Sequence, residues 1–564
     1  MKKLQKEQKI FIFAMFMLLF LQMVVLLFFA GKKSGFHEDE LYTYYSINRT
    51  AGLFAEDRTW MDTEQLKNEF VVLEGEQFNY SLVKTVQSWD VHPPLYYYIV
   101  HTVCSLSPGV FSKWQGILVN LIAYVLSFVL LAKVVFTAVT IPENAFADMG
   151  KKEIKSGETV HPTEVCKPDG FLRARLITLL VCGFWGFSCA VISGVMFIRM
   201  YQWLTVFILL CLWLHLRAVS KLDVGIKGFL LPLALTVFLG FMTQYYYIIF
   251  HIFLGAGFCI LLIKHRKIKE TFAYAVACAI GLGSAFIYYP SSLAHIFRGY
   301  RGTEAVSEFG DVSNTWDRLR FFVGLFDDYV LSGTLSIWML VICLLGITAW
   351  YLQKRRRWEG KFFSETVGLL VFTAAGYFFT ISKTALLLGE TSNRYQLPIY
   401  GLLLFLLVYA VWFLAEGFLR LKGIGSKKLP VVAAVLAVVL LLTDMWALTC
   451  GKVIFLYKEE AGMEEFVCDN EEVPVLVSYN ENGADHIWWL ADRLMVYDNV
   501  YLASQQNREP IVDTKITESD SVLVYVSAWE EEESFLQELI QNNPNLSSCR
   551  LVAKKTLWTL YELS

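Results

Sequence analysis

Long apolar runs separated by short polar stretches occupy the first 450 residues of the chain. A helix that crosses a bilayer needs about 20 mostly apolar residues, and each run is close to that length. The pattern therefore predicts an α-helical polytopic membrane protein with about eleven membrane-spanning helices. We expect these helices at residues 10–31, 114–137, 174–196, 201–218, 227–244, 246–264, 271–290, 333–353, 364–381, 397–417 and 429–450.

The pattern changes after residue 450, where the composition becomes ordinary and acidic. Short runs rich in β-branched and aromatic residues predict strands at 475–479, 500–504, 521–526 and 551–561. Residues 530–543 predict a helix whose acidic first turn interacts favourably with the helix dipole. We therefore expect a small C-terminal α/β domain over residues 451–564, after a transmembrane domain over residues 1–450.

Composition supports the membrane class. Hydrophobic residues make up 55% of the chain and charged residues only 18%, whereas a soluble domain carries about 25% charged residues. The net charge of −3 gives no indication of a nucleic-acid partner. The eleven cysteines include no Cys-x-x-Cys pair and no metal-type spacing. In the tail, Cys468 and Cys549 could pair if this region is extracytoplasmic.

The distribution of basic residues predicts the orientation in the membrane. Lysines precede the first apolar run, which is too long for a signal-peptide core, so we expect a retained helix and a cytoplasmic N-terminus. With eleven crossings, four basic clusters fall on the cytoplasmic side, and a crossing at 94–107 would move all four of them to the outside. That segment is also too short to span and is expected to be interfacial or re-entrant. The prediction is a multi-pass plasma-membrane protein with the clusters at 151–175, 264–269, 354–357 and 422–428 inside.

Three regions then face outward, and the first of them, 32–113, carries candidate chemistry. It opens with Phe36-His37-Glu38-Asp39-Glu40, directly after the first helix. Crowded carboxylates raise one another's pKa, so such a group can hold a general base near its working range. The alternative is a solvated acidic stretch next to the membrane, which is common in outer loops.

The same loop ends in Asp90-Val91-His92-Pro93-Pro94, followed by an aromatic-rich turn. The two prolines fix the backbone, and the aromatic residues suit the membrane interface. His92 is placed to enter a pocket just outside the bilayer. The alternative is an interfacial anchor in which the histidine has no chemical role.

Together these motifs resemble the glycosyltransferase C superfamily. The branch they resemble contains the protein O-mannosyltransferases and aminoarabinose transferases, family 39 and similar bacterial enzymes. Asp39 and Glu40 match the catalytic pair of that family, and His92-Pro93-Pro94 matches its second motif. The resemblance implies a fold of the same superfamily and a catalytic first outer loop.

Further matches follow in the expected order along the chain. Arg199 and Tyr201 match an Arg-x-Tyr motif at an outer helix end, and Arg394 and Tyr395 match a late Arg-Tyr-x-x-Pro motif. Gln244 stands where the family usually has histidine in Thr-His-Tyr-Tyr. Arg199 could alternatively extend to the interface as a snorkelling side chain. Arg394 could alternatively pair with Glu390 one helical turn earlier.

The resemblance implies a reaction at the outer face. The donor is a sugar joined to a polyprenyl phosphate, and the acceptor is a hydroxyl of a lipid, glycan or protein. Asp39 acts as the base and Glu40 orients it or the acceptor. The cations Arg199 and Arg394, with His92, stabilise the leaving phosphate, and the anomeric centre is inverted. The remaining expected substrate-binding residues are Tyr201, Gln244 and Tyr395.

Two questions stay open at the level of sequence. We expect no required cofactor, although His37, Glu38, Asp39 and Glu40 offer hard ligands for a divalent metal; four adjacent residues rarely converge on one ion. Two other functions also fit parts of the pattern. One is a polymerase or ligase of lipid-linked glycans, with the loop 291–332 contacting a longer substrate. The other is a polytopic transporter or flippase.

Overall fold

The computed structural model describes residues 2–48, 54–149, 168–354, 364–386, 388–421, 428–528, 531–555 and 557–564. The chain forms two compact units. The first, here called the membrane unit, comprises Met1–Gly31, Gln87–Tyr96 and Ile117–Ile454. The second, here called the sheet unit, comprises Lys32–Val86, Tyr97–Gly116 and Phe455–Ser564.

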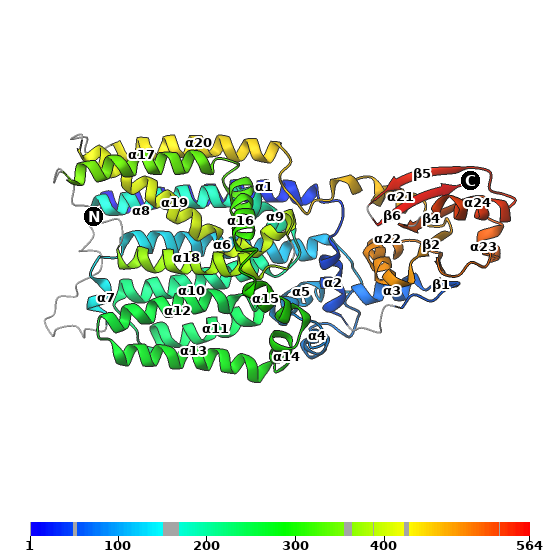
Figure 1. Ribbon diagram of the computed structural model, residues 1–564, viewed down its shortest axis with the longest axis horizontal. Helices are drawn as coiled ribbons and strands as arrows, with labels where there is room; N and C mark the ends of the chain where they lie inside the picture. Colours follow the sequence, from blue (N-terminus) through cyan, green and yellow to red (C-terminus); the bar gives the residue numbers. More distant parts are fainter. Residues whose placement is uncertain are drawn as a thin grey trace. The chain divides into compact units, whose positions relative to one another are not determined.

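Long helices that run side by side make up the membrane unit (Figure 1). They are α1 (Lys2–Gly31), α6 (Lys113–Thr140), α8 (Pro168–Phe187), α10 (Tyr201–Lys221), α11 (Leu231–Thr243), α12 (Tyr247–Lys264), α13 (Ile268–Tyr288), α17 (Leu335–Lys354), α18 (Glu365–Thr384), α19 (Asn393–Leu421) and α20 (Leu429–Thr449). These bounds lie close to the predicted apolar runs, because hydrophobic length is what selects a membrane helix.

The number of spans agrees with the sequence pattern. Within the described ranges, ten helices are each long and apolar enough to cross a membrane. An eleventh span results if α16 (Thr315–Val330) and α17, which are bent by 96° at their junction, count as one. The predicted polytopic helical fold is therefore confirmed. Several basic residues used to predict the orientation fall outside the described residues, namely Lys151, Lys152, Lys155, Arg355, Arg356, Arg357, Lys422 and Lys427.

The predicted single helix at 174–196 is wrong in one respect, because it breaks at Ser188. There the backbone is extended (φ −65°, ψ 141°), and a separate short helix, α9 (Cys189–Met196), follows. All eight residues of α9 are buried. The segment 94–107 contains α5 (Leu95–Cys104), whose ten residues extend only about 15 Å at 1.5 Å per residue. This helix is too short to span a bilayer, as expected.

Short helices follow α13 at one end of the membrane unit. They are α14 (Ser291–Phe297), α15 (Tyr300–Gly310) and α16, which runs across the long helices in Figure 1. Buried Lys383 at the end of α18 donates hydrogen bonds to the Asp311 carbonyl and the Asn314 side chain. Arg318 of α16 donates to the Ala385 carbonyl at 2.6 Å. Hydrogen bonds from Lys383 and Arg318 thus join the segment 311–318 to the end of α18.

The other short elements of this unit are α7 (Ala145–Asp148), a π-helical turn (Ile226–Leu230) and a 3-10 turn (Glu390–Ser392).

A six-stranded sheet with order β1-β3-β2-β4-β6-β5 forms the centre of the sheet unit. The strands β2 (Val475–Tyr479), β3 (Val500–Ser504) and β4 (Val522–Ser527) are parallel and entirely buried. Such continuous apolar runs are typical of parallel strands covered on both faces. The edges are antiparallel: β1 (Thr59–Met61) pairs with β3, and β5 (Cys549–Lys554) and β6 (Trp558–Leu563) pair with each other.

Helices surround this sheet. In the N-terminal part they are α2 (Glu38–Ser46), α3 (Thr63–Phe70) and α4 (Tyr80–Gln87). In the tail they are α21 (Met463–Asp469), α22 (Ala491–Leu494), α23 (Thr514–Thr517), α24 (Glu532–Asn542) and the 3-10 segments Lys458–Glu460 and Glu481–Leu490. The predicted C-terminal α/β domain and its helix near 530–543 are confirmed. The single predicted strand at 551–561 is wrong, because the chain reverses between β5 and β6. Cys468 and Cys549, whose pairing the sequence left open, are free, exposed thiols.

Candidate functional site

The three acidic residues of the first loop form the first turn of α2. His37 caps this helix: its Nδ1 accepts a hydrogen bond from the Asp39 amide at 3.1 Å. Glu40 completes the capping box, because its Oε2 accepts from the His37 amide at 2.6 Å. Carboxylates in a first turn are stabilised by the positive end of the helix dipole. The acidic cluster therefore has a structural reason to exist, apart from any chemistry.

Glu40 is fully buried together with Lys33. Neither side chain is exposed to solvent, and Lys33 Nζ lies 2.9 Å from Glu40 Oε2. The same ammonium donates to the Phe455 carbonyl at 2.7 Å. Burial lowers the pKa of Lys33, and the Glu40 carboxylate opposes that shift. The Glu40 carboxylate thus serves the fold of the sheet unit, and its predicted role in orienting Asp39 or the acceptor stays a prediction.

Asp39 differs from Glu40 because its side chain keeps 19% of its surface exposed. Its Oδ2 lies 3.8 Å from His37 Nδ1, and its carbonyl accepts a hydrogen bond from Thr43. Burial raises the pKa of nearby Tyr42 to about 12, and the charges of Asp485 and Glu38 act in the same direction. A phenol next to these acids therefore stays protonated at neutral pH. Of the matched pair, Asp39 is the carboxylate that remains accessible for proton transfer.

In the membrane unit, His92 links Asp90 to Arg199. His92 Nδ1 lies 2.8 Å from Asp90 Oδ2, and His92 Nε2 lies 3.3 Å from Arg199 Nη2. A guanidinium can only donate, so Nε2 accepts and the imidazole proton is on Nδ1, facing the carboxylate. Burial would raise the pKa of Asp90, but His92 and Arg199 together lower it below the ordinary value. Arg199 thus has a buried histidine as one partner, and Asp90 holds the histidine in place.

The position of Arg199 depends on Asn120 of α6. The buried Asn120 amide donates to the Val195 carbonyl at 3.1 Å and to the Phe197 carbonyl at 2.6 Å. Val195 is in the last turn of α9 and Phe197 directly follows the helix, where carbonyls lack amide partners within the helix. The Arg199 amide in turn donates to the Phe197 carbonyl at 2.7 Å. The break between α8 and α9 and this amide clamp together place the guanidinium beside His92.

Arg394, near the start of α19, lies among aromatic rings. Its guanidinium carbon is 5.1 Å from the centre of the Phe197 ring, 6.0 Å from that of Tyr201 and 5.2 Å from that of Tyr395. Tyr395 also packs edge-on against Tyr201 and Tyr246, with ring centres 5.8 Å and 6.0 Å apart. These cation–π contacts help to hold the guanidinium in its buried position.

Two residues of this cluster were not predicted as site residues, Tyr245 and His295. His295 Nδ1 lies 3.0 Å from the Tyr245 hydroxyl, and His295 Nε2 lies 3.3 Å from the Ser88 carbonyl. The carbonyl can only accept, so Nε2 donates and Nδ1 accepts from Tyr245. Burial and the charge of Asp90 both raise the pKa of Tyr245. The sequence signal for His295 was its place in the loop 291–332, considered for a longer substrate. The signal for Tyr245 was its place after Gln244 in the segment that resembles Thr-His-Tyr-Tyr.

These contacts close a circle at one end of the membrane unit. Arg199 and Arg394 both adjoin Phe197, Tyr395 meets Tyr246, and Tyr245 leads through His295 back to the segment that bears His92. The buried residue Gln244 caps the C-terminal end of α11, directly before Tyr245 and Tyr246. The predicted site residues that gather here come from four distant segments of the chain: His92, Arg199 and Tyr201, Gln244, and Arg394 and Tyr395. Asp39 and Glu40 belong to the sheet unit.

No group of three or more His, Cys, Asp or Glu side chains is arranged to hold a metal ion within the described part of the chain. The residues His37 and Asp39 approach each other only at 3.8 Å, and Glu40 is committed to Lys33. Of the four adjacent ligands considered from the sequence, Glu40 thus faces Lys33, whereas His37 and Asp39 face each other.

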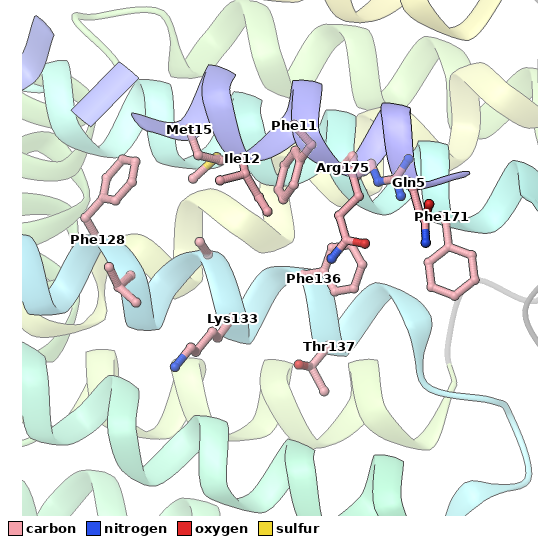
Figure 2. Close-up of a pocket in the computed structure, with 13 residues that line it drawn as sticks. Gln5, Phe11, Ile12, Met15, Phe128, Lys133, Phe136, Thr137, Phe171 and Arg175 are labelled. Atoms are coloured by element: carbon pink, nitrogen blue, oxygen red, sulfur yellow. The ribbon is translucent and has the colours of Figure 1, made fainter. Parts of the chain in front are cut away.

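A separate groove lies between α1, α6 and α8 (Figure 2). Its volume is about 800 Å³, and it includes none of the predicted site residues. Figure 2 shows mostly apolar side chains along it, among them Phe11, Ile12 and Phe128. The two cations beside it are engaged elsewhere: Lys133 lies 4.6 Å from the Trp213 ring centre, and Arg175 pairs with Glu7 at 3.2 Å. The composition of this groove is that of a surface in contact with lipid.

Comparison with known proteins gives one structural likeness. No protein-family model and no curated protein matches the chain. A solved structure that is similar to it is that of ArnT from Cupriavidus metallidurans bound to undecaprenyl phosphate. The two chains share 12% identical residues, the match covers 97% of each, and the TM-score is 0.42. The function of this chain is therefore inferred from its own residues and contacts.

Proposed function

We propose that this protein is a membrane glycosyltransferase that transfers a sugar from a polyprenyl-phosphate donor to an acceptor hydroxyl. The observation that carries the proposal is the closed circle of contacts in the membrane unit. It gathers His92, Arg199 and Arg394, the residues that the motif resemblance assigns to the donor phosphate. The meeting of these distant motifs at one place supports the assignment of one shared site.

The chemistry of the leaving group fits these cations. When the bond between the anomeric carbon and the phosphate oxygen breaks, the lipid phosphate gains negative charge. Two buried guanidinium groups stabilise that charge without needing to move. Asn120 and the Asp90-bound His92 position Arg199, and aromatic rings hold Arg394. Tyr201, Tyr395 and Gln244 complete the binding surface.

The acceptor requires a base, and we assign this role to Asp39. The acceptor oxygen attacks the anomeric carbon from the side opposite the phosphate, its proton passes to the Asp39 carboxylate, and the bond to the phosphate breaks. One displacement of this kind inverts the anomeric centre. The support for Asp39 is its partial exposure next to a fully buried Glu40. The mechanism needs no metal, because the cations of the chain supply the positive charge.

A membrane location follows from the donor. A polyprenyl chain stays in the bilayer, so an enzyme that uses it must present its site at the membrane surface. The proposed orientation has a cytoplasmic N-terminus, with the site and the C-terminal domain on the extracytoplasmic side of the plasma membrane. The acceptor is a lipid, glycan or protein that reaches this side.

Release of lipid phosphate tests the proposal. Purified protein in nanodiscs is incubated with a panel of polyprenyl-phosphate sugars, and free polyprenyl phosphate is measured. We expect release from at least one donor, and a loss of about a hundredfold or more in Arg199→Gln and in Arg394→Gln, the usual effect of removing one charge-stabilising donor. Arg217→Gln is the matched control, because Arg217 lies near the other end of α10 and contacts Trp213.

The result that would contradict the proposal is equally direct. Absence of release with every donor, while the same sample moves lipid-linked sugars across the bilayer of a vesicle, would indicate a flippase. If lipid phosphate is released equally fast by Arg199→Gln, Arg394→Gln and the control, the residues of this circle of contacts take no part in the reaction.

A further inference from the structure

The sheet unit contains a small pocket beside the end of strand β3. Its volume is about 120 Å³, well below the roughly 300–1,000 Å³ of pockets that hold drug-sized ligands. Ile511, Phe535 and Leu539 give it apolar walls, and Arg58, Glu538 and Asn542 are among its polar lining residues. A pocket of this size accepts one small ring or one terminal group of a longer molecule.

The pocket lies where open α/β sheets bind their ligands. The parallel strands β3, β2 and β4 end at Ser504, Tyr479 and Ser527. Ligands of such sheets bind outside the carboxyl ends of the strands, on the loops that follow them. The pocket is lined by Ser504 and the loop after it and by residues of α24. Ile511 and Leu539 also belong to the hydrophobic core, so its apolar walls are continuous with the core.

Arg58 supplies a strained and incompletely bonded cation to this pocket. Its φ angle is +60°, a left-handed backbone conformation that a non-glycine residue seldom adopts. One guanidinium nitrogen, Nη2, donates to the Glu509 and Asn507 carbonyls at 2.6 Å and 3.3 Å. The other, Nη1, is buried and has no acceptor among the described residues. Backbone strain of this kind concentrates at sites that hold ligands.

The lining chemistry favours a sugar over an anion. Glu538 and Glu509 offer carboxylate acceptors, Arg58 offers a donor, and the Asn542 amide offers both. Sugar hydroxyls donate and accept, so they match such a mixed set, and the C–H face of a sugar ring can pack on Phe535. A phosphate would meet two carboxylates here, and the third acid, Glu531, already pairs with Arg508.

We propose that this pocket binds one sugar residue of a saccharide acceptor. The biological role of this sugar binding rests on the proposed transferase function. The C-terminal domain then serves to recognise the acceptor. The loop segment that carries Arg58 joins the sheet through β1, whose Thr59 pairs with Leu502 of β3. The first loop and the tail therefore build the pocket together, which explains why a three-residue strand from the first loop is added to the edge of the sheet.

Ligand-detected NMR on the full-length protein tests this inference. The protein is placed in nanodiscs without glycoside detergent and titrated with methyl glycosides of glucose, galactose, mannose, arabinose and N-acetylglucosamine. Saturation transfer to the glycoside gives its dissociation constant. The test variants are Glu538→Gln and Asn542→Ala on the exposed face of α24, and Arg58→Lys. The matched control is Glu533→Gln, an exposed acid of the same helix that does not line the pocket.

We expect at least one glycoside to bind, and each test variant to weaken it by about tenfold, the effect of one lost hydrogen bond to a charged or polar partner. Glu533→Gln should bind as the wild type does. Because α24 variants change only exposed side chains, they test the pocket even if Arg58→Lys does not fold. Asp39→Asn should leave this binding unchanged, so a failure of sugar transfer and a failure of sugar binding are separate results.

Three outcomes would overturn the inference. The first is that no glycoside binds the wild-type protein. The second is binding that the pocket variants leave intact, which would locate the sugar elsewhere. The third is displacement of the glycoside by inorganic phosphate at equal concentration, which would identify an anion site on Arg58.

Discussion

Adjacent residues with the same charge have different surroundings in this protein. Asp39 and Glu40 are neighbours in the sequence, yet Asp39 is partly exposed and Glu40 is completely buried against Lys33. Successive helical residues are separated by about 100° around the helix axis, so the two carboxylates face different sides of α2. The two acids that match one motif in the sequence therefore have different roles: Asp39 is the candidate base, and Glu40 is a structural acid.

The structural role of Glu40 can be tested by charge removal. Glu40→Gln leaves the buried Lys33 ammonium without its carboxylate partner and is expected to lower the free energy of unfolding by about 3–5 kcal/mol. The double variant Lys33→Met, Glu40→Met should recover most of that loss, because it removes both charges. Chemical denaturation followed by circular dichroism measures the effect. An unchanged stability together with lost transferase activity would instead assign Glu40 to the reaction.

Asp90 predicts a dependence of stability on pH. Its pKa is lowered in the folded protein because His92 and Arg199 outweigh the effect of burial. A carboxyl with a depressed pKa stabilises the fold above its unfolded pKa, near 4, and this contribution is lost as the pH falls through the lower folded value. The side chain is 38% exposed, so solvent screening limits the contribution to about 1 kcal/mol or less.

Comparison of Asp90→Asn with the wild type measures this contribution. The wild type should have the higher thermal midpoint at pH 6 to 7, and the difference should shrink as the buffer is taken below about pH 4. A difference that is constant over the whole range would show that the carboxylate charge is not what stabilises the pairing with His92.

At the scale of elements, the short helix α9 and the long helix α6 together position Arg199. Asn120→Ala would remove the Asn120 donor from the Val195 carbonyl and one of the two donors from the Phe197 carbonyl, at a cost of about 1–3 kcal/mol. We expect a higher KM for the donor in addition, since Arg199 would no longer be held beside His92. Thr140→Ala is the control, because its hydroxyl bonds only within α6. An unchanged KM with reduced stability would limit Asn120 to a structural role.

Elements defined by local pattern were predictable, and elements defined by distant pairing were not. Hydrophobic length identified the membrane helices, and apolar runs identified the buried strands β2, β3 and β4. The reversal between β5 and β6 has no Gly, Pro or Asn among the described residues between Lys554 and Trp558 that would mark a turn. The three residues of β1 form a strand only because Thr59 meets Leu502, more than 400 positions later.

In the site, too, residues in local motifs could be predicted from the sequence, whereas residues brought in by distant contacts could not. The motifs placed His92, Arg199, Gln244 and Arg394 at helix ends, and the structure gathers them at one end of the membrane unit. The contributions of Asp90, Tyr245 and His295 depend on three-dimensional contacts between segments up to about 200 residues apart. The burial of Glu40 by Lys33 likewise required the fold of the sheet unit, because both residues lie in a short polar stretch that the sequence presents as exposed.

At the scale of the whole molecule, the orientation in the membrane follows from the parity of the spans. With eleven spans the N-terminus and the C-terminal domain lie on opposite sides, and the eleventh span depends on counting α16 and α17 as one. Cys549 in the tail is a free, exposed thiol and provides a native label site. A second thiol can be introduced with Lys267→Cys, between α12 and α13.

Labelling of intact cells with a membrane-impermeant maleimide tests this orientation. In a chain whose only cysteine is Cys549, labelling should occur without permeabilisation. In a chain whose only cysteine comes from Lys267→Cys, it should occur only after permeabilisation. Labelling of both positions from the same side would mean an even number of crossings between them and would contradict the eleven-span arrangement.

The most direct measurement for the central claim is single-turnover release of polyprenyl phosphate by Asp39→Asn. Loss of a well-placed base lowers the rate of a proton-transfer step by about 10²–10⁴, while the partly exposed position of Asp39 should leave folding intact. We therefore predict a variant that is folded, binds the donor and releases lipid phosphate at least a hundredfold more slowly than the wild type. A variant that retains more than about a tenth of the wild-type rate would exclude Asp39 as the base.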